Sequence, residues 1–169
     1  MKLLAISGSL QARSANTALL RVARLVVSDD VEIVLFHDVA AIPAFNPDTD
    51  PAPESVEELR SLVKSSDGLL IATPEYAFGL PGSLKNLLDW LVGSGELYEK
   101  RVAILSAAPS RERGQNARAD LDRTLRAQGA FVLQSTTIAV PANVRGYEAD
   151  EPEIREAVLN LVAVFQDDA

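Results

Sequence analysis

Hydroxyl, amide and glycine residues are concentrated near the start of the chain, within residues 7–17. These positions are Ser7, Gly8, Ser9, Ser14, Asn16 and Thr17. Because the stretch joins an apolar run to a segment of helical spacing, its hydroxyls and backbone N–H groups would surround a helix N-terminus. Such a place stabilises an anion without a fixed cation. The pattern therefore predicts a phosphate cradle.

The stretch matches neither the dinucleotide fingerprint G-x-G-x-x-G nor the Walker pattern with its lysine. A nucleotide bound here should be a mononucleotide with a terminal phosphate. A simpler alternative stays open, in which Ser14 or Asn16 only caps the helix that follows.

A second unusual stretch, residues 72–91, begins on an apolar run and ends on a regular helix. Pro74 pushes Thr73 into extended geometry, and Gly79 permits a turn. One apolar helical stripe then consists of Leu84, Leu87, Leu88 and Leu91.

That stripe does not explain the sequence Glu75-Tyr76-Ala77-Phe78. Apolar and aromatic surface on a loop next to a phosphate cradle would suit a flat heteroaromatic ring. In the alternative, Tyr76 and Phe78 fold back into the core.

Short β-branched runs alternate with helical segments along the whole chain. The predicted strands are residues 2–7, 31–36, 68–73, 101–106 and 131–138, and the predicted helices are residues 14–27, 54–63, 83–91, 116–126 and 153–165. Nearly unbroken apolar strands are expected when helices cover both faces of a parallel sheet. The fold class is therefore α/β, a doubly wound sheet in one domain, residues 1–169. For a strand order of 2-1-3-4-5, ligands bind beyond the first and third strands.

Composition excludes several functions. The net charge of −8 argues against nucleic-acid binding, which needs a basic face. The chain has no cysteine and a single histidine, His37, so we predict no metal site and no Ser-His-Asp chemistry. We expect no signal peptide, no membrane span and a cytoplasmic location. Residues 37–53, rich in Pro and Asp, should form a surface loop that is a plain connector rather than a binding loop.

Two motifs resemble those of the NADPH-dependent FMN reductase family, whose flavodoxin-like members include quinone, azo-compound and chromate reductases. The family's G-S-L-R-x-x-S-x-N is matched by residues 8–16, and its P-E-Y-N-x-x-x-P-G-x-L-K-N-x-x-D-W by residues 74–90. The resemblance spans nearly the whole chain and implies a three-layer α/β/α sandwich. It also implies FMN, with its phosphate on the first loop and its isoalloxazine ring along the second.

The chain departs from the family pattern at three places. Gln11 stands where the family has a phosphate-contacting arginine, unless Arg13 reaches the same oxygen atoms, and Ala77 replaces the usual asparagine. The loop after the fourth strand, residues 106–114, is usually rich in glycine. Here it carries Arg111 and Arg113, and Arg118 follows in the next helix.

Cations near a helix N-terminus oppose the helix dipole, and an anionic guest would relieve that conflict. We therefore hypothesise that Arg111 or Arg113 binds a phosphate of NADPH. The alternative is that Glu112 and solvent screen these charges. The predicted cofactor-binding residues are Ser9, Gln11, Arg13, Ser14, Asn16, Thr17, Pro74, Glu75, Tyr76, Ala77, Phe78, Gly79, Ser106, Arg111 and Arg113.

The resemblance implies that hydride passes from NADPH through FMN to a small acceptor such as a quinone, free flavin, azo compound or metal oxyanion. The protein then supplies orientation and exclusion of water, so we predict no catalytic side chain. An electron carrier of the flavodoxin type without NADPH turnover, and a nucleotide-binding module without flavin, are the alternatives. The family implies a homodimer or homotetramer, to which Trp90 and Tyr98 could contribute, although Trp90 could instead cover the core.

Overall fold

The computed structural model describes residues 1–140 and 151–166, and these form one parallel sheet flanked by helices. The strand order is β2-β1-β3-β4-β5, as predicted. The strands are β1 (Lys2–Ser7), β2 (Glu32–Phe36), β3 (Gly68–Ala72), β4 (Arg101–Ala108) and β5 (Phe131–Ala139). All four pairings are parallel. This confirms the predicted fold class, a flavodoxin-like three-layer α/β/α sandwich.

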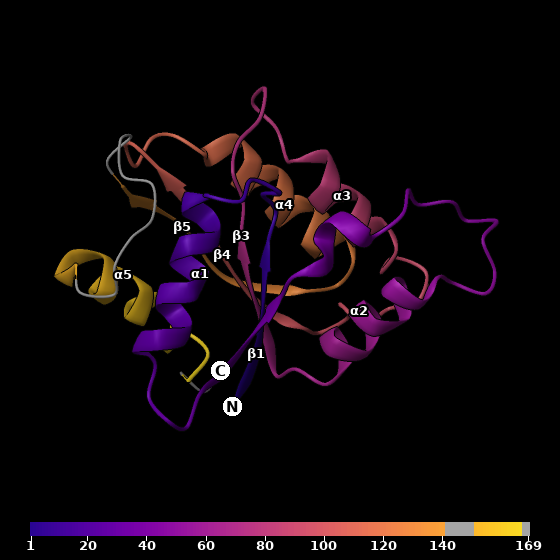
Figure 1. Ribbon diagram of the computed structural model, residues 1–169, viewed down its shortest axis with the longest axis horizontal. Helices are drawn as coiled ribbons and strands as arrows, with labels where there is room; N and C mark the ends of the chain where they lie inside the picture. The colour runs from indigo at the N-terminus through magenta and orange to yellow at the C-terminus, as the bar shows by residue number, and fades with distance from the viewer. Residues whose placement is uncertain (141–150, 167–169) are drawn as a thin grey trace.

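Helices cover both faces of the sheet, as Figure 1 shows. They are α1 (Ala15–Val26), the short 3₁₀ helix η1 (Asp38–Ala41), α2 (Glu54–Lys64), α3 (Gly82–Asp89), α4 (Gln115–Ala127) and α5 (Pro152–Ala163). Alternate residues of each central strand enter opposite cores. Leu3 and Ala5 of β1 pack with α1 and α5, whereas Leu4 and Ile6 pack with α2, α3 and α4.

Three expectations about the elements need correction. The segment 37–53 is not loop throughout, because it begins with η1 and buries Val39 and Ile42, two side chains spaced at the 3₁₀ period. Strand β4 continues past residue 106 to Ala108, because the extended β5 pairs with it as far as Ala139. Strand β5 is not buried on both faces, and Phe131 is 55% exposed because β5 lies at the edge of the sheet.

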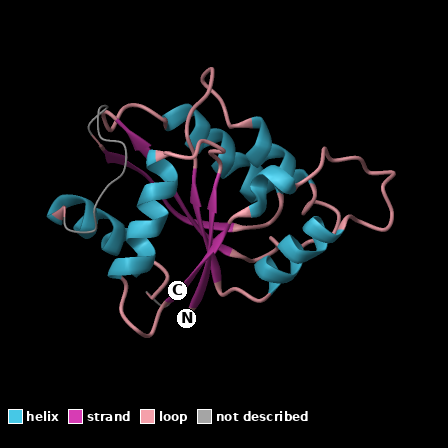
Figure 2. Cartoon of the chain, viewed as in Figure 1, coloured by secondary structure: helices cyan, strands magenta, loops and turns pink. Residues whose placement is uncertain are grey.

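The carboxyl ends of β1 and β3 lie side by side at the point where the winding direction reverses. Ser7 is in register with Ala72, and the Gly8 N–H donates to the Ala72 carbonyl at 2.8 Å. A Cβ added to Gly8 would lie 2.9 Å from Cδ2 of Leu84, so α3 packs directly against the first loop. The loops after β1 and β3 project at this edge (Figure 2). The fold thus brings together the two loops that the sequence singled out.

Candidate cofactor site at the carboxyl edge of the sheet

The first loop is ordered by hydrogen bonds among its own hydroxyl groups. The Ser7 and Thr17 hydroxyls lie 2.7 Å apart, and the Ser9 N–H donates to Ser7 Oγ at 3.3 Å. Ser9 Oγ accepts in turn from the Gln11 N–H at 3.3 Å. Ser9 is buried, whereas Gln11 and Arg13 are exposed at the rim.

Helix α1 begins beneath this loop with a neutral cap. Ser14 is the N-cap, and its Oγ accepts from the Thr17 N–H at 3.4 Å. The capping alternative therefore describes Ser14 correctly, and it leaves the Ser14 hydroxyl proton as a donor. The first turn of α1 contains no acidic residue, so no carboxylate of this turn offsets the partial positive charge of its N–H groups.

Asn16 does not cap the helix. Its Oδ1 accepts from the Ala107 N–H at 2.9 Å, which joins α1 to the end of β4, and Asn16 is 4% exposed. The side-chain group that Asn16 can turn toward an anion is its Nδ2 amide, a donor.

The loop after β3 is a tight two-residue turn. Tyr76 and Gly79 exchange both backbone hydrogen bonds, at 3.2 and 3.0 Å. Ala77 and Phe78 between them have φ of 50° and 62°, the pattern of a type I′ turn, which usually contains Asn and Gly. The residues with a left-handed backbone conformation are thus Ala77 and Phe78. Gly79 instead pairs with Tyr76 at the end of the turn. The turn is strained at a predicted site residue.

The aromatic rings of this turn do not fold back into the core. Tyr76 is 54% exposed and Phe78 is 80% exposed. Both residues therefore stand on the surface, and the alternative that placed them in the core is wrong for this chain.

Glu75 has a partner that the sequence did not reveal. Its Oε2 accepts from the backbone N–H groups of Asn116 and Ala117, at 2.9 and 3.1 Å, in the first turn of α4. The residue at the N-cap of α4 is Gly114, which has no side chain to accept these bonds. A glycine at the N-cap indicates that another residue must cap the helix. The sequence does not indicate which distant residue supplies that cap.

The three arginines in and after the loop that follows β4 differ in burial and in their partners. Arg118 donates to Ser135 Oγ at 3.1 Å, and burial lowers the pKa of Arg118, while the charge of Glu75 raises it in part. Arg111 and Arg113 are exposed, and the Arg113 carbonyl accepts from Thr137 Oγ1 at 3.0 Å. The anion at the start of α4 is thus a carboxylate of this chain.

Ser106 lies beneath this loop and is 1% exposed. Gly114, at φ 80°, sits directly over it, and a Cβ at Gly114 would lie only 2.5 Å from Ser106 Oγ. Ser106 therefore lies in the packing between β4 and α4 and not on the surface of the two loops.

Asn86 and Trp90, near the end of the second motif, contact the segment between η1 and α2. Asn86 donates through Nδ2 to the Pro43 carbonyl and accepts through Oδ1 from the Phe45 N–H, both at 2.8 Å. Trp90 Nε1 also donates to the Pro43 carbonyl, and its ring meets Phe45 edge to face. Trp90 is 3% exposed and covers the core, whereas Tyr98 is 68% exposed. An aromatic surface at a subunit contact could thus include Tyr98 but not Trp90.

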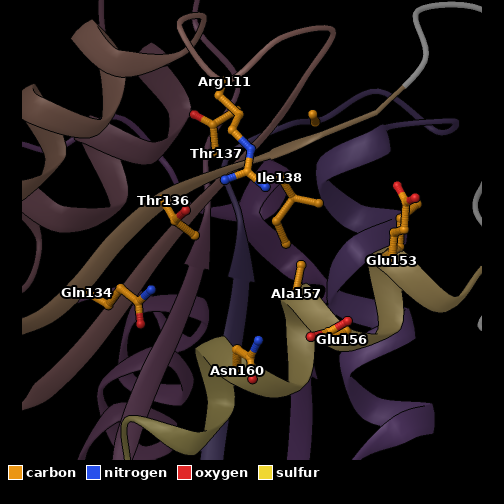
Figure 3. Close-up of a pocket in the computed structure, with 11 residues that line it drawn as sticks. Arg111, Gln134, Thr136, Thr137, Ile138, Glu153, Glu156, Ala157 and Asn160 are labelled. Atoms are coloured by element: carbon orange, nitrogen blue, oxygen red, sulfur yellow. The ribbon is translucent and has the colours of Figure 1, made fainter.

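A polar cavity of about 420 Å³ lies elsewhere, between β5 and α5. Figure 3 shows Arg111 extending over Thr137 and Ile138 at one end, with Glu153 and Glu156 on the opposite wall. None of the residues that line it belongs to the first or the second loop. The two loops therefore form an open surface at the sheet edge, separate from this cavity.

The described residues offer neither a membrane-spanning helix nor a metal site. No helix there is long and apolar enough to cross a membrane, and no group of three or more His, Asp or Glu side chains there could hold a metal ion.

Residues 1–144 match the model of the family described as NADPH-dependent FMN reductase. The chain belongs to this family, a family of oxidoreductases. It is 33% identical to a NAD(P)H-dependent FMN reductase of Pseudomonas aeruginosa, over 98% of this chain and 94% of that protein. It is 31% identical to a NADPH azoreductase of a Bacillus species, over 96% and 92%.

Solved structures support the same assignment of fold. The flavoenzyme NAD(P)H:(acceptor) oxidoreductase of Paracoccus denitrificans superposes with a TM-score of 0.78 at 25% identity, covering 98% of this chain and 95% of that one. Oxidised flavodoxin 1 of Bacillus cereus superposes with a TM-score of 0.61 at 15% identity, covering 100% of both chains. The second likeness concerns the fold alone.

Proposed function

We propose that this protein is an FMN-dependent NAD(P)H oxidoreductase that passes hydride from NADPH, through bound FMN, to a small acceptor. Candidate acceptors are a quinone, free flavin, an azo compound or a metal oxyanion. The observation that carries the proposal is the register of β1 and β3, which end side by side at Ser7 and Ala72, so that the hydroxyl-rich loop and the aromatic loop leave the sheet next to each other at its switch point. Relatives named as FMN, quinone and azo reductases support it.

The residues of the first loop fit a phosphate group. Backbone N–H groups of the first turn of α1, the Ser14 hydroxyl and the Asn16 amide are all donors at an N-terminus that has no acidic residue in its first turn. Ser9 and Thr17 add hydroxyls, and Gln11 and Arg13 stand at the exposed rim. A Cβ at Gly8 would crowd the side chain of Leu84, so the loop packs closely on α3.

The second loop fits the flat ring. The backbone from Pro74 to Gly79 and the exposed rings of Tyr76 and Phe78 would lie along the isoalloxazine, whose burial against aromatic surface is favourable. Bound FMN supplies the hydride chemistry. The side chains of this chain bind and orient the ring and exclude water from one face, and we assign no catalytic side chain.

The same fold would serve an electron carrier, and the net charge of −8 suits one. Two measurements separate the candidates. A purified protein that takes up FMN, with quenching of flavin fluorescence, and that steadily oxidises NADPH in the presence of a quinone or free FMN is the reductase. Flavin uptake without that turnover identifies the carrier, and no uptake at saturating FMN refutes both.

We propose that Arg111 or Arg113 contacts a phosphate of NADPH, a second anion in addition to the carboxylate of Glu75 that already caps α4. Arg111 would have to leave the cavity between β5 and α5 to do so, whereas Arg113 does not line that cavity. Both are exposed at the loop after β4, and Glu112 between them is held by Ser110, whose hydrogen bond lowers the pKa of Glu112. Replacing both arginines by alanine should raise the KM for NADPH about tenfold, as expected for loss of one charge-assisted contact. Arg123→Ala, on the exposed face of α4, is the matched control. An unchanged KM in the double variant would refute the assignment.

A further inference from the structure

Helix α4 cannot cap its own first turn. Gly114 occupies the N-cap in the left-handed conformation, and the first turn contains no acidic residue. The first N–H groups of any helix have no partner within it, so an acceptor must come from elsewhere.

Glu75 is that acceptor. One oxygen of its carboxylate accepts from both the Asn116 and the Ala117 N–H groups, at 2.9 and 3.1 Å, although Glu75 lies about forty residues earlier in the chain. A carboxylate at a helix N-terminus gains from the hydrogen bonds and from the helix dipole together.

The charge of Glu75 also acts on Arg118, one turn into the same helix. Arg118 itself donates to Ser135 Oγ on β5, which ties α4 to the edge strand. This arrangement favours a carboxylate over a neutral side chain at position 75.

The turn that follows Glu75 is closed by its own two backbone hydrogen bonds, between Tyr76 and Gly79. Its two rings are exposed, and Ala77 and Phe78 are strained at positive φ. Its far end also lies against α4, because a Cβ at Gly79 would lie 3.6 Å from Oδ2 of Asp120. Strained turns persist only where the surroundings hold them in place.

We infer that Glu75 is a positioning residue, which fixes the aromatic turn of residues 76–79 by anchoring it to the N-terminus of α4. The inference rests on the proposed function, because the turn matters to catalysis only where it forms the bed for a flavin. Glu75 itself would act through α4 and not through contact with the reacting atoms.

The test compares Glu75→Ala with Glu75→Gln in FMN titrations of the ligand-free protein followed by flavin fluorescence. The Ala variant loses the charge and both hydrogen bonds, and its dissociation constant for FMN should rise about tenfold or more. The Gln variant keeps an acceptor oxygen but loses the charge, so it should recover part of that loss. Glu58→Ala, an exposed glutamate on α2, is the matched control and should bind as the unchanged protein does.

Amide hydrogen exchange of the same ligand-free proteins provides a second readout that needs no flavin. The Asn116 and Ala117 amides should exchange faster in Glu75→Ala and regain protection in Glu75→Gln. The inference is overturned if Glu75→Ala binds FMN within twofold of the unchanged protein, or if it binds poorly while both amides stay protected. Failure of the unchanged protein to bind FMN would instead refute the proposed function.

Discussion

Helices α1 and α4 begin at the same edge of the sheet, but their N-termini differ in electrostatic state. Helix α1 starts with the neutral cap Ser14 and has no acidic residue in its first turn. Helix α4 starts with Gly114 and already binds the carboxylate of Glu75. One terminus is thus open to an external anion, whereas the other is neutralised by the chain itself. The difference teaches that cation-rich surroundings, such as those of α4, do not by themselves mark a site for an anionic ligand.

The largest effect should come from Gly114→Ala, which breaks the start of α4. The new Cβ would lie 2.5 Å from Ser106 Oγ, and alanine is strained at φ 80°. Strain and overpacking together should lower the free energy of unfolding by about 3 kcal/mol in denaturant titrations. The control is Gly95→Ala, at φ 79° with no atom within 4 Å of its Cβ, which should cost about 1 kcal/mol. Equal losses in the two variants would contradict the packing of Gly114 on Ser106.

The second prediction makes α1 resemble α4. Ser14→Asp keeps a good N-cap but places a carboxylate where we expect the FMN phosphate, so the dissociation constant for FMN should rise about thirtyfold. Ser14→Asn has nearly the same shape without the charge and should bind FMN within a few fold of the unchanged protein. Equal binding by the two variants in a fluorescence titration would place the phosphate elsewhere.

A smaller effect is expected where α1 is tied to β4. Asn16→Ala leaves the partly buried Ala107 N–H without its acceptor, which should lower the free energy of unfolding by about 1 kcal/mol. Asn16→Asp keeps an acceptor oxygen and should lose less stability, while weakening FMN binding through its charge. An Ala variant that unfolds at the same denaturant concentration as the unchanged protein would show that this hydrogen bond does not stabilise the fold.

The smallest effect concerns the turn that Glu75 anchors to α4. Ala77 has φ of 50°, where asparagine is favoured, so Ala77→Asn should raise the free energy of unfolding by about 0.5 kcal/mol. Glu99→Asn, at φ 57° on a remote loop, should give a similar gain and is the matched comparison. A fall in thermal stability in Ala77→Asn alone would mean that the turn does not tolerate a longer side chain.

Most of the fold could be predicted because it depends on patterns that are local in sequence. Apolar runs such as residues 68–73 predicted the buried strands, and helix spacing predicted α1 and α3 to within one or two residues. The errors lie where tertiary position decides. Strand β5 is half exposed because it is an edge strand, and the 3₁₀ helix η1 is too short for its period to stand out.

For the candidate site, the sequence predicted which loops form it but not the contacts that each side chain makes. Gly, Ser and Pro in excess identified the loops after β1 and β3, and the topology brings them together. The role of Glu75 was not predictable, because its partners Asn116 and Ala117 are backbone groups about forty residues away. For the same reason, the pattern could not show that the Asn16 amide oxygen is bound to β4 rather than turned toward a ligand.

The pairing of Asn86 with the backbone of Pro43 and Phe45 has a consequence for how the long segment before α2 can vary. The Asn86 side-chain amide accepts from the Phe45 N–H and donates to the Pro43 carbonyl, as the backbone of a neighbouring strand would. These two bonds fix residues 43–45 on α3. Residues 46–50 beyond them are exposed and form their own turn, closed by Thr49 on Asn46. We therefore expect insertions and deletions in that outer part to leave α3 and the loop that precedes it undisturbed.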